Sequence, residues 1–95
     1  MDLEIDNAVG LALRDLRKRK GLTQESLALE AGAERTYVSL IERGKNSPSV
    51  RMLYRLCAVM GVSPSELLSH ADELLVPPQS AQVRKKPYSK KVSNI

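Results

Sequence analysis

Residues 22–44 read LTQESLALEAGAERTYVSLIERG, and this stretch predicts two short helices that meet at a glycine turn. Thr23 is a good N-cap for the first helix, whose apolar positions recur three and four residues apart. Gly32 comes directly after the last of these positions and adopts a left-handed conformation at little cost. The chain is therefore expected to turn sharply at Gly32 and to enter the second helix at once.

The second helix of this stretch has two unlike faces. At about 100° per residue, Tyr37, Val38 and Ile41 lie on one side of the helix. Ala28 is small where the first helix crosses the second, which permits the close approach of a helix-turn-helix. The other side of the second helix carries hydrogen-bonding groups, namely Arg35, Thr36, Ser39 and Arg43.

One further helix is predicted before this stretch and two after it. The first runs from about Asp6 to Lys20, and Ser49 can cap a fourth that closes at Gly61. The sequence SPSE at 63–66 is a capping box with proline at the first helical position, so a fifth helix begins there. The apolar stripes of these three helices are Val9, Leu13 and Leu16; Val50, Leu53, Leu56 and Met60; and Leu67, Leu68, Ala71, Leu74 and Leu75.

Length and composition favour one small all-α domain. The chain has 95 residues, three Tyr and no Phe or Trp, which suits a helical core better than a sheet. So few aromatic rings disfavour a protein that stacks single-stranded bases. Pro77 and Pro78 end the fifth helix, so we expect a domain at 1–76 and a flexible tail at 77–95. No apolar run reaches the about 20 residues of a membrane span, and we expect a cytoplasmic protein.

The charge of the chain is unevenly distributed. The formal net charge is +4, yet residues 1–75 hold ten Lys and Arg against eleven Asp and Glu. The remaining residues have no acid and five cations, so this basic tail either adds phosphate affinity or only aids solubility. The run from Arg17 to Lys20 either complements the dipole of the first helix or faces a phosphate backbone. The five cations of the tail are Arg84, Lys85, Lys86, Lys90 and Lys91.

The residues that could carry catalysis or bind a metal are isolated. Cys57 is the only cysteine and falls within an apolar stripe, so we interpret it as a core residue. His70 is the only histidine, and we expect it to be exposed on the fifth helix. The sequence has no phosphate loop, metal-ligand spacing or nucleophile with a neighbouring base. We therefore expect no cofactor, no metal and no enzymatic activity.

The same residues resemble the Cro/repressor-like helix-turn-helix proteins, also called the XRE family. The resemblance covers about residues 9–70 and is closest to the controller proteins of restriction-modification systems, which share the RTYVS run at 35–39. It implies a five-helix, lambda-repressor-like DNA-binding domain. It also implies an inward-facing salt bridge between Arg17 and Glu42 that holds the second motif helix against the first helix of the domain. The residues that carry the resemblance are Gln24, Leu27, Ala28, Gly32, Val38, Ile41 and the run from Ile41 to Lys45.

A recognition helix in the major groove needs side chains near its N-terminus that reach base edges. Arg35 can donate two hydrogen bonds to guanine, and Thr36 offers a hydroxyl and a methyl group; with Ser39 they match the base-contacting positions of the family. Tyr37 either grips a phosphate or packs against its neighbours, and Leu40 either touches a thymine methyl or is simply exposed. The predicted phosphate contacts are Gln24, Tyr37, Arg43, Lys45 and Asn46.

Three reading side chains are too few for a unique genomic address, because each contributes about 1 to 3 kcal/mol of discrimination. We therefore predict a homodimer on a partly palindromic operator, with Leu68, Leu74 and Leu75 at the interface unless they complete the monomer core. The predicted function is sequence-specific transcriptional regulation, including regulation of the protein's own gene. The alternative is an antitoxin, in which the fifth helix and the tail bind a toxin protein.

Overall fold

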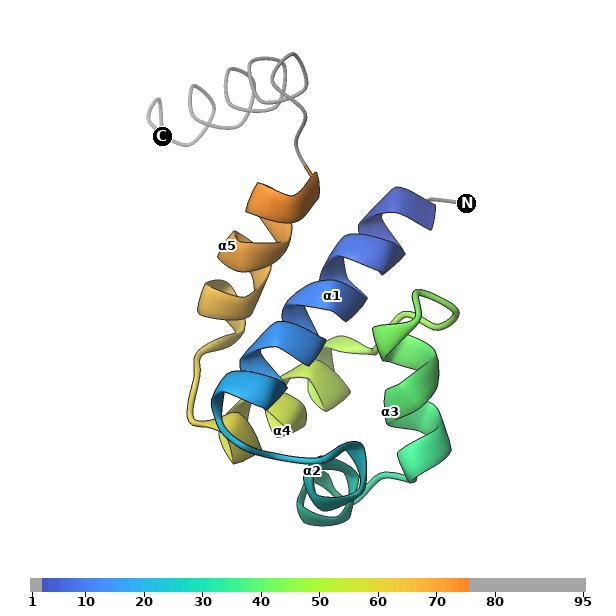
Figure 1. Ribbon diagram of the computed structural model, residues 1–95, viewed down its shortest axis with the longest axis vertical. Helices are drawn as coiled ribbons and strands as arrows, with labels where there is room; N and C mark the ends of the chain where they lie inside the picture. Colours follow the sequence, from blue (N-terminus) through green and yellow to red (C-terminus); the bar gives the residue numbers. More distant parts are fainter. Residues whose placement is uncertain (1–2, 76–95) are drawn as a thin grey trace.

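A computed structural model describes residues 3–75, which form five α-helices and no strand. The helices α1 and α5 lie side by side, and α2 and α3 lie at the other end of the molecule (Figure 1). The prediction of an all-α domain with five helices is confirmed, and the basic tail lies outside the described residues. The helices are α1 (Leu3–Arg19), α2 (Gln24–Ala31), α3 (Arg35–Glu42), α4 (Val50–Met60) and α5 (Pro64–Leu75).

Short polar side chains begin three of the helices, as predicted. The Thr23 hydroxyl accepts a hydrogen bond from the Ser26 backbone N–H at 2.9 Å, and the Ser26 hydroxyl accepts one from the Thr23 N–H. The hydroxyls of Ser49 and Ser63 likewise accept from backbone N–H groups, at 3.1 and 3.0 Å. Each bond satisfies a backbone donor that has no partner within the helix.

The turn between α2 and α3 is made by Gly32. Its φ of 73° and ψ of 34° lie in the left-handed region, which glycine enters without steric cost. The N–H of Ala33 reaches back to the Ala28 carbonyl at 2.8 Å, which completes the hydrogen bonding of the helix end. Figure 1 shows α2 nearly end-on and α3 side-on, so the two helices cross steeply at this turn.

Two details differ from the sequence-based prediction. The first helix begins at Leu3 instead of Asp6, because no helix breaker precedes Asp6 and the acids of the first turn favour a helix N-terminus. It ends at Arg19, and Lys20 belongs to the following turn. Val50 was placed on a buried face but is 71% exposed. It lies about 60° around α4 from Leu53, on the side of the solvent-exposed Tyr54.

The core is a single cluster of aliphatic side chains drawn from all five helices. Leu27, Val38 and Ile41 of the two motif helices are completely buried, as are Leu56 of α4 and Leu67 of α5. Cys57 is also buried within the cluster, so its interpretation as a core residue is confirmed. Burial and the nearby Glu66 carboxylate raise the pKa of the Cys57 thiol to about 11. Among residues 3–75 no helix is both long and apolar enough to span a bilayer.

Candidate DNA interface

The outer face of α3 presents the three side chains that we predicted to read bases. Arg35 and Thr36 are exposed at the N-terminus of α3, and Ser39 is half-buried one turn further along. On the inner face of the same helix, Val38 and Ile41 have no exposed surface. The helix is therefore bound to the core by its apolar side and presents its polar side to solvent.

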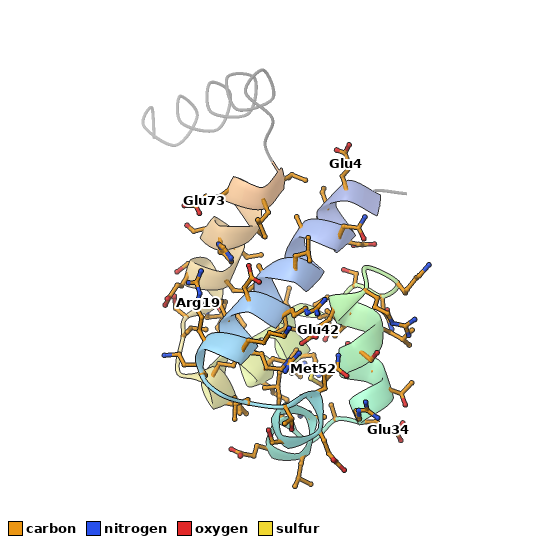
Figure 2. The ribbon with its side chains drawn as sticks, in the orientation of Figure 1. Glu4, Arg19, Glu34, Glu42, Met52 and Glu73 are labelled. Carbon is orange, nitrogen blue, oxygen red and sulfur yellow. The ribbon has the colours of Figure 1, made fainter. Side chains whose placement is uncertain are left out.

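A buried ion pair lies beneath the C-terminal end of α3. The Arg17 guanidinium of α1 donates from Nε to Glu42 Oε2 at 2.6 Å and from Nη2 to Oε1 at 3.0 Å. The side chains are only 9% and 2% exposed, and Figure 2 shows Glu42 between α3 and α1. The resemblance implied this pair, and the structure contains it. Because Arg17 is committed to Glu42, it does not belong to a phosphate-facing run with Lys18 and Lys20.

Gln24 extends this ion pair into a network that includes α2. Its amide Nε2 donates to Glu42 Oε1 at 3.0 Å, while Arg17 Nη1 donates to the Leu22 carbonyl at 2.7 Å. Glu42 thus accepts hydrogen bonds from two helices besides its own. Sequence reasoning assigned Gln24 only to phosphate binding and missed its bond to Glu42, because the relative placement of α2 and α3 decides that contact. One amide hydrogen of Gln24 is left for a phosphate.

The backbones of α1 and α3 also meet directly. Gly10 is buried, and a Cβ atom there would collide with the carbonyl oxygens of Ile41 and Glu42. Asn7, one turn earlier on α1, packs against Gly44 at the end of α3. Sequence reasoning did not single out Gly10, although a lone glycine inside a helical pattern costs about 1 kcal/mol relative to alanine and can have a packing reason.

The other polar and apolar side chains on and around α3 differ in exposure. Arg43 and Lys45 are exposed at the C-terminal end of α3 and in the following turn, and Asn46 is half-buried beside them. Tyr37 is half-buried and packs against the core, which is the second of its two interpretations. Leu40 is half-buried as well. Glu34 precedes α3 as its N-cap residue, makes no side-chain capping bond and is exposed at the start of the helix (Figure 2).

His70 is not exposed, and that prediction was wrong. Its Nε2 lies 3.0 Å from Asp15 Oδ2 on α1, its Nδ1 lies 3.7 Å from Glu73 Oε1, and its side chain is 18% exposed. The cause is the packing of α5 along α1, because His70 is three residues after the buried Leu67 and shares its face. His70 therefore ties α5 to α1. Among residues 3–75 no three His, Cys, Asp or Glu side chains are grouped to hold a metal ion.

The three leucines predicted for the dimer interface differ in exposure. Leu68 and Leu74 are each 43% exposed on α5, whereas Leu75 is half-buried against the core. Leu75 thus contributes in part to the monomer, and Leu68 and Leu74 leave apolar surface in solvent.

The comparisons with known proteins agree with this geometry. Residues 13–67 match the helix-turn-helix family. A transcriptional regulator of this type from Sinorhizobium fredii, y4dJ, is 39% identical over 71 residues, which are 75% of this chain and 92% of the relative. The control protein C.MunI from a Mycoplasma species is 42% identical over 65 residues, 67% of this chain and 88% of its own length. The restriction-modification controller C.Esp1396I, solved as a tetramer with its natural 35 base-pair operator, matches with a TM-score of 0.69 and 26% identity over 77% of this chain and 96% of its own.

The chain belongs to the helix-turn-helix family of XRE type, and it is a DNA-binding transcriptional regulator. Within that family it is similar to the restriction-modification controller proteins, as its RTYVS run indicated.

Proposed function

We propose that two copies of this chain bind a partly palindromic operator, each with α3 in the major groove. The observation that carries the proposal is the outer face of α3, where Arg35 and Thr36 are exposed and Ser39 is half-buried, on a helix whose C-terminal end is held by the hydrogen bonds of Arg17 and Gln24 to Glu42. A reading helix needs such fixation, because base contacts discriminate only when the side chains are held in register.

In this proposal Arg35 donates to a guanine, while Thr36 and Ser39 bond to neighbouring base edges. Gln24, Arg43, Lys45 and Asn46 hold the phosphates on either side, whereas Tyr37 packs against the core. Arg43 and Lys45 support this division because they are exposed at the end of α3. The backbone N–H groups at the start of α2, beside Gln24, also favour an anion, because they lie at the positive end of the helix dipole.

Dimerisation supplies the second half-site in this account. The exposed Leu68 and Leu74, together with Leu75 beside them, offer an apolar contact surface on α5. Two copies place their reading helices about 34 to 36 Å apart, which is one turn of B-DNA. Sedimentation of the DNA-free protein tests this step. We expect a dimer that persists below micromolar concentration and that Leu74→Asp disrupts. A protein that is still monomeric well above micromolar concentration would exclude the dimer.

The operator is expected to lie in promoters at the nucleoid, that of the protein's own gene included, with residues 1–76 as the DNA-binding domain. The proposed activity is occupancy of DNA and not catalysis. The antitoxin alternative gains no support from the relatives described above, whose names are those of transcriptional regulators and control proteins. The operator-bound tetramer of C.Esp1396I supports self-association on DNA for this chain by similarity only.

Footprinting on the DNA upstream of the protein's own gene tests this proposal. We expect one protected region containing two related half-sites, with protection that Arg35→Ala abolishes at the same protein concentration. As a control, Arg55→Ala removes another exposed arginine, from α4, and leaves the protected region in place. Uniform protection along the fragment, or an unchanged footprint with Arg35→Ala, would overturn the proposal.

A further inference from the structure

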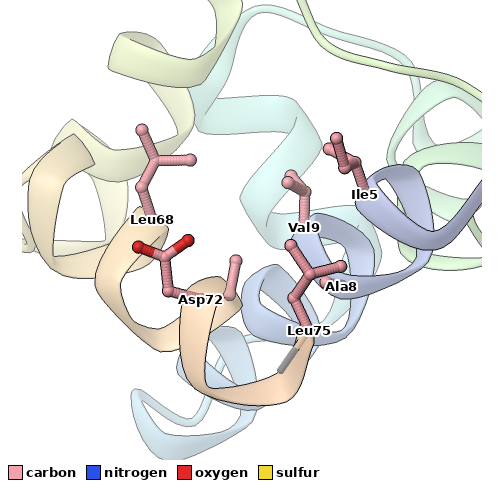
Figure 3. A pocket seen from close by; sticks show the side chains of 7 residues that line it. Ile5, Ala8, Val9, Leu68, Asp72 and Leu75 are labelled. Atoms are coloured by element: carbon pink, nitrogen blue, oxygen red, sulfur yellow. The ribbon is translucent and has the colours of Figure 1, made fainter. Parts of the chain in front are cut away.

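An apolar groove lies between α1 and α5, at the end of the domain away from α2. It is a cavity of about 250 Å3 whose walls include Ile5 and Val9 from α1 and Leu68 and Leu75 from α5 (Figure 3). Ile5 and Leu68 are 45% and 43% exposed, so the groove opens to solvent. Two of its residues, Leu68 and Leu75, also belong to the dimer surface proposed above.

The two segments that form the groove are acidic. Residues 3–13 contain Glu4 and Asp6 and no Lys or Arg, and α5 contains Glu66, Asp72 and Glu73 and no Lys or Arg. Asp72 lies at the edge of the groove, and Glu4 lines the adjoining hollow that also contains Leu11 and Leu74. The groove therefore combines an apolar floor with an acidic rim. An occupant that carries both apolar and cationic side chains complements it.

The basic tail has this composition and begins at the groove. Leu75 lines the groove, and the first cation of the tail, Arg84, follows it by nine residues. Nine residues span at most about 30 Å, so the cations can reach any part of the rim. Apolar side chains alternate with the cations, namely Val83, Tyr88, Val92 and Ile95.

We propose that the basic tail binds in the groove of its own chain, with its apolar side chains on Ile5, Val9, Leu68 and Leu75 and its cations on the acidic rim. Attachment at residue 76 gives the tail an effective concentration of about millimolar at the groove, so a weak contact suffices.

This occupancy has a consequence for the dimer of the proposed function. The tail in the groove covers Leu68 and Leu75, which are two of the three leucines assigned to the dimer interface. DNA phosphates compete with the rim for the same cations. The tail and a second copy therefore compete for this surface, and binding of DNA to the tail favours the dimer, which also forms without DNA. This consequence rests on the proposed function, whereas the binding of the tail in the groove does not.

A spin label on the tail of the full-length Leu74→Asp variant, in which the proposed dimer is disrupted, tests the proposal. Ser89→Cys places a reactive thiol among the cations, while Cys57 is buried and its pKa of about 11 keeps it protonated and unreactive near neutral pH. The nitroxide is expected to broaden the methyl resonances of Ile5, Val9, Leu68 and Leu75. The methyl resonances of Leu27 and Val38, in the motif at the other end of the domain, are expected to stay sharp.

Two comparisons make the result specific. Lys85→Gln with Lys86→Gln in the labelled protein is expected to reduce the broadening at least twofold, whereas the matched pair Lys18→Gln and Lys20→Gln on α1 leaves it unchanged. Spin-labelled protein of natural isotopic abundance is then mixed with isotopically enriched protein that carries no nitroxide. In this mixture the broadening is expected to disappear. Persistence in the mixture would overturn the proposal in favour of a second copy, and absence of broadening at the four groove residues would overturn it altogether. Neither measurement involves DNA, so a failure of the tail-binding proposal can be distinguished from a failure of the proposed function.

Discussion

The two ends of this domain are built on opposite principles. At the α2–α3 end, a buried polar network of Arg17, Gln24 and Glu42 lies beneath a polar exposed face. At the α1–α5 end, Ile5, Leu11, Leu68 and Leu74 leave apolar surface in solvent, and His70 makes the cross-helix hydrogen bond that joins the two helices. Hydrogen bonds depend on direction and can therefore fix the orientation of a helix. Apolar contacts have no preferred direction and can accept different binding partners. The contrast indicates that the first end fixes the orientation of α3, whereas the second end leaves apolar surface exposed.

The largest effect is expected from breaking the network under α3. Glu42→Ala leaves the Arg17 guanidinium buried without its partner, which costs about 3 to 5 kcal/mol of unfolding free energy. Urea denaturation measures the loss, and Glu30→Ala on the exposed side of α2 is the control, with a change within about 0.5 kcal/mol. A similar small change for both variants would show that the network does not hold α3.

A smaller loss of unfolding free energy is expected from a substitution where the backbones of α1 and α3 touch. Gly10→Ala drives a methyl group toward the carbonyl oxygens of Ile41 and Glu42, and such overpacking costs about 1 to 3 kcal/mol. Gly21→Ala is the matched control, because its Cβ meets nothing and only the positive φ of 73° is strained. The affinity for operator DNA is expected to fall with Gly10→Ala and to persist with Gly21→Ala. Equal affinities in the two variants would contradict the close contact at Gly10 as a determinant of the placement of α3.

Removing one phosphate contact is expected to change the salt dependence of DNA binding by a modest amount. Lys45→Ala weakens binding to all sequences alike and reduces the slope of log K against log salt by about 1. Fluorescence anisotropy at several salt concentrations measures the slope. Arg55→Ala removes the same charge from α4 and is expected to leave it unchanged. An unaltered slope for Lys45→Ala would remove Lys45 from the interface.

The smallest effect is expected at the α1–α5 end. The hydrogen bond between His70 and Asp15 is partly solvated, so the coupling free energy between the two side chains is at most about 1 kcal/mol. A double-mutant cycle with His70→Ala and Asp15→Ala measures it by chemical denaturation. A coupling as large as the loss expected for Glu42→Ala would erase the proposed difference between the two ends.

Local signals in the sequence predicted most of the fold. Thr23 and Ser49 cap helices, and the glycine at 32 ends one, because these residues act within one turn of the chain. The polar and apolar sides of α3 follow from helical spacing alone. Val50 and His70 were misplaced because their exposure depends on where neighbouring helices lie, which spacing within one helix does not report.

The site divides in the same way. The outward direction of Arg35 and Thr36 was predictable from the sequence, and their contacts with bases stay a prediction. The pairing of Arg17 with Glu42, which are 25 residues apart, came from family resemblance, and the bond from Gln24 to Glu42 was missed. Both depend on how three helices are arranged in space. The groove at Ile5 and Leu68 was likewise not predictable, because it is formed by residues that are more than 60 positions apart in the sequence.

The most direct test of reading by α3 is the selectivity of the triple variant Arg35→Ala, Thr36→Ala and Ser39→Ala. The ratio of affinities for the footprinted operator and a scrambled duplex is measured at one salt concentration, with urea denaturation as a check on folding. The account predicts that the ratio falls to nearly one, because each lost contact removes about 1 to 3 kcal/mol of discrimination, while the fold is retained. An unchanged ratio in a folded variant would contradict it.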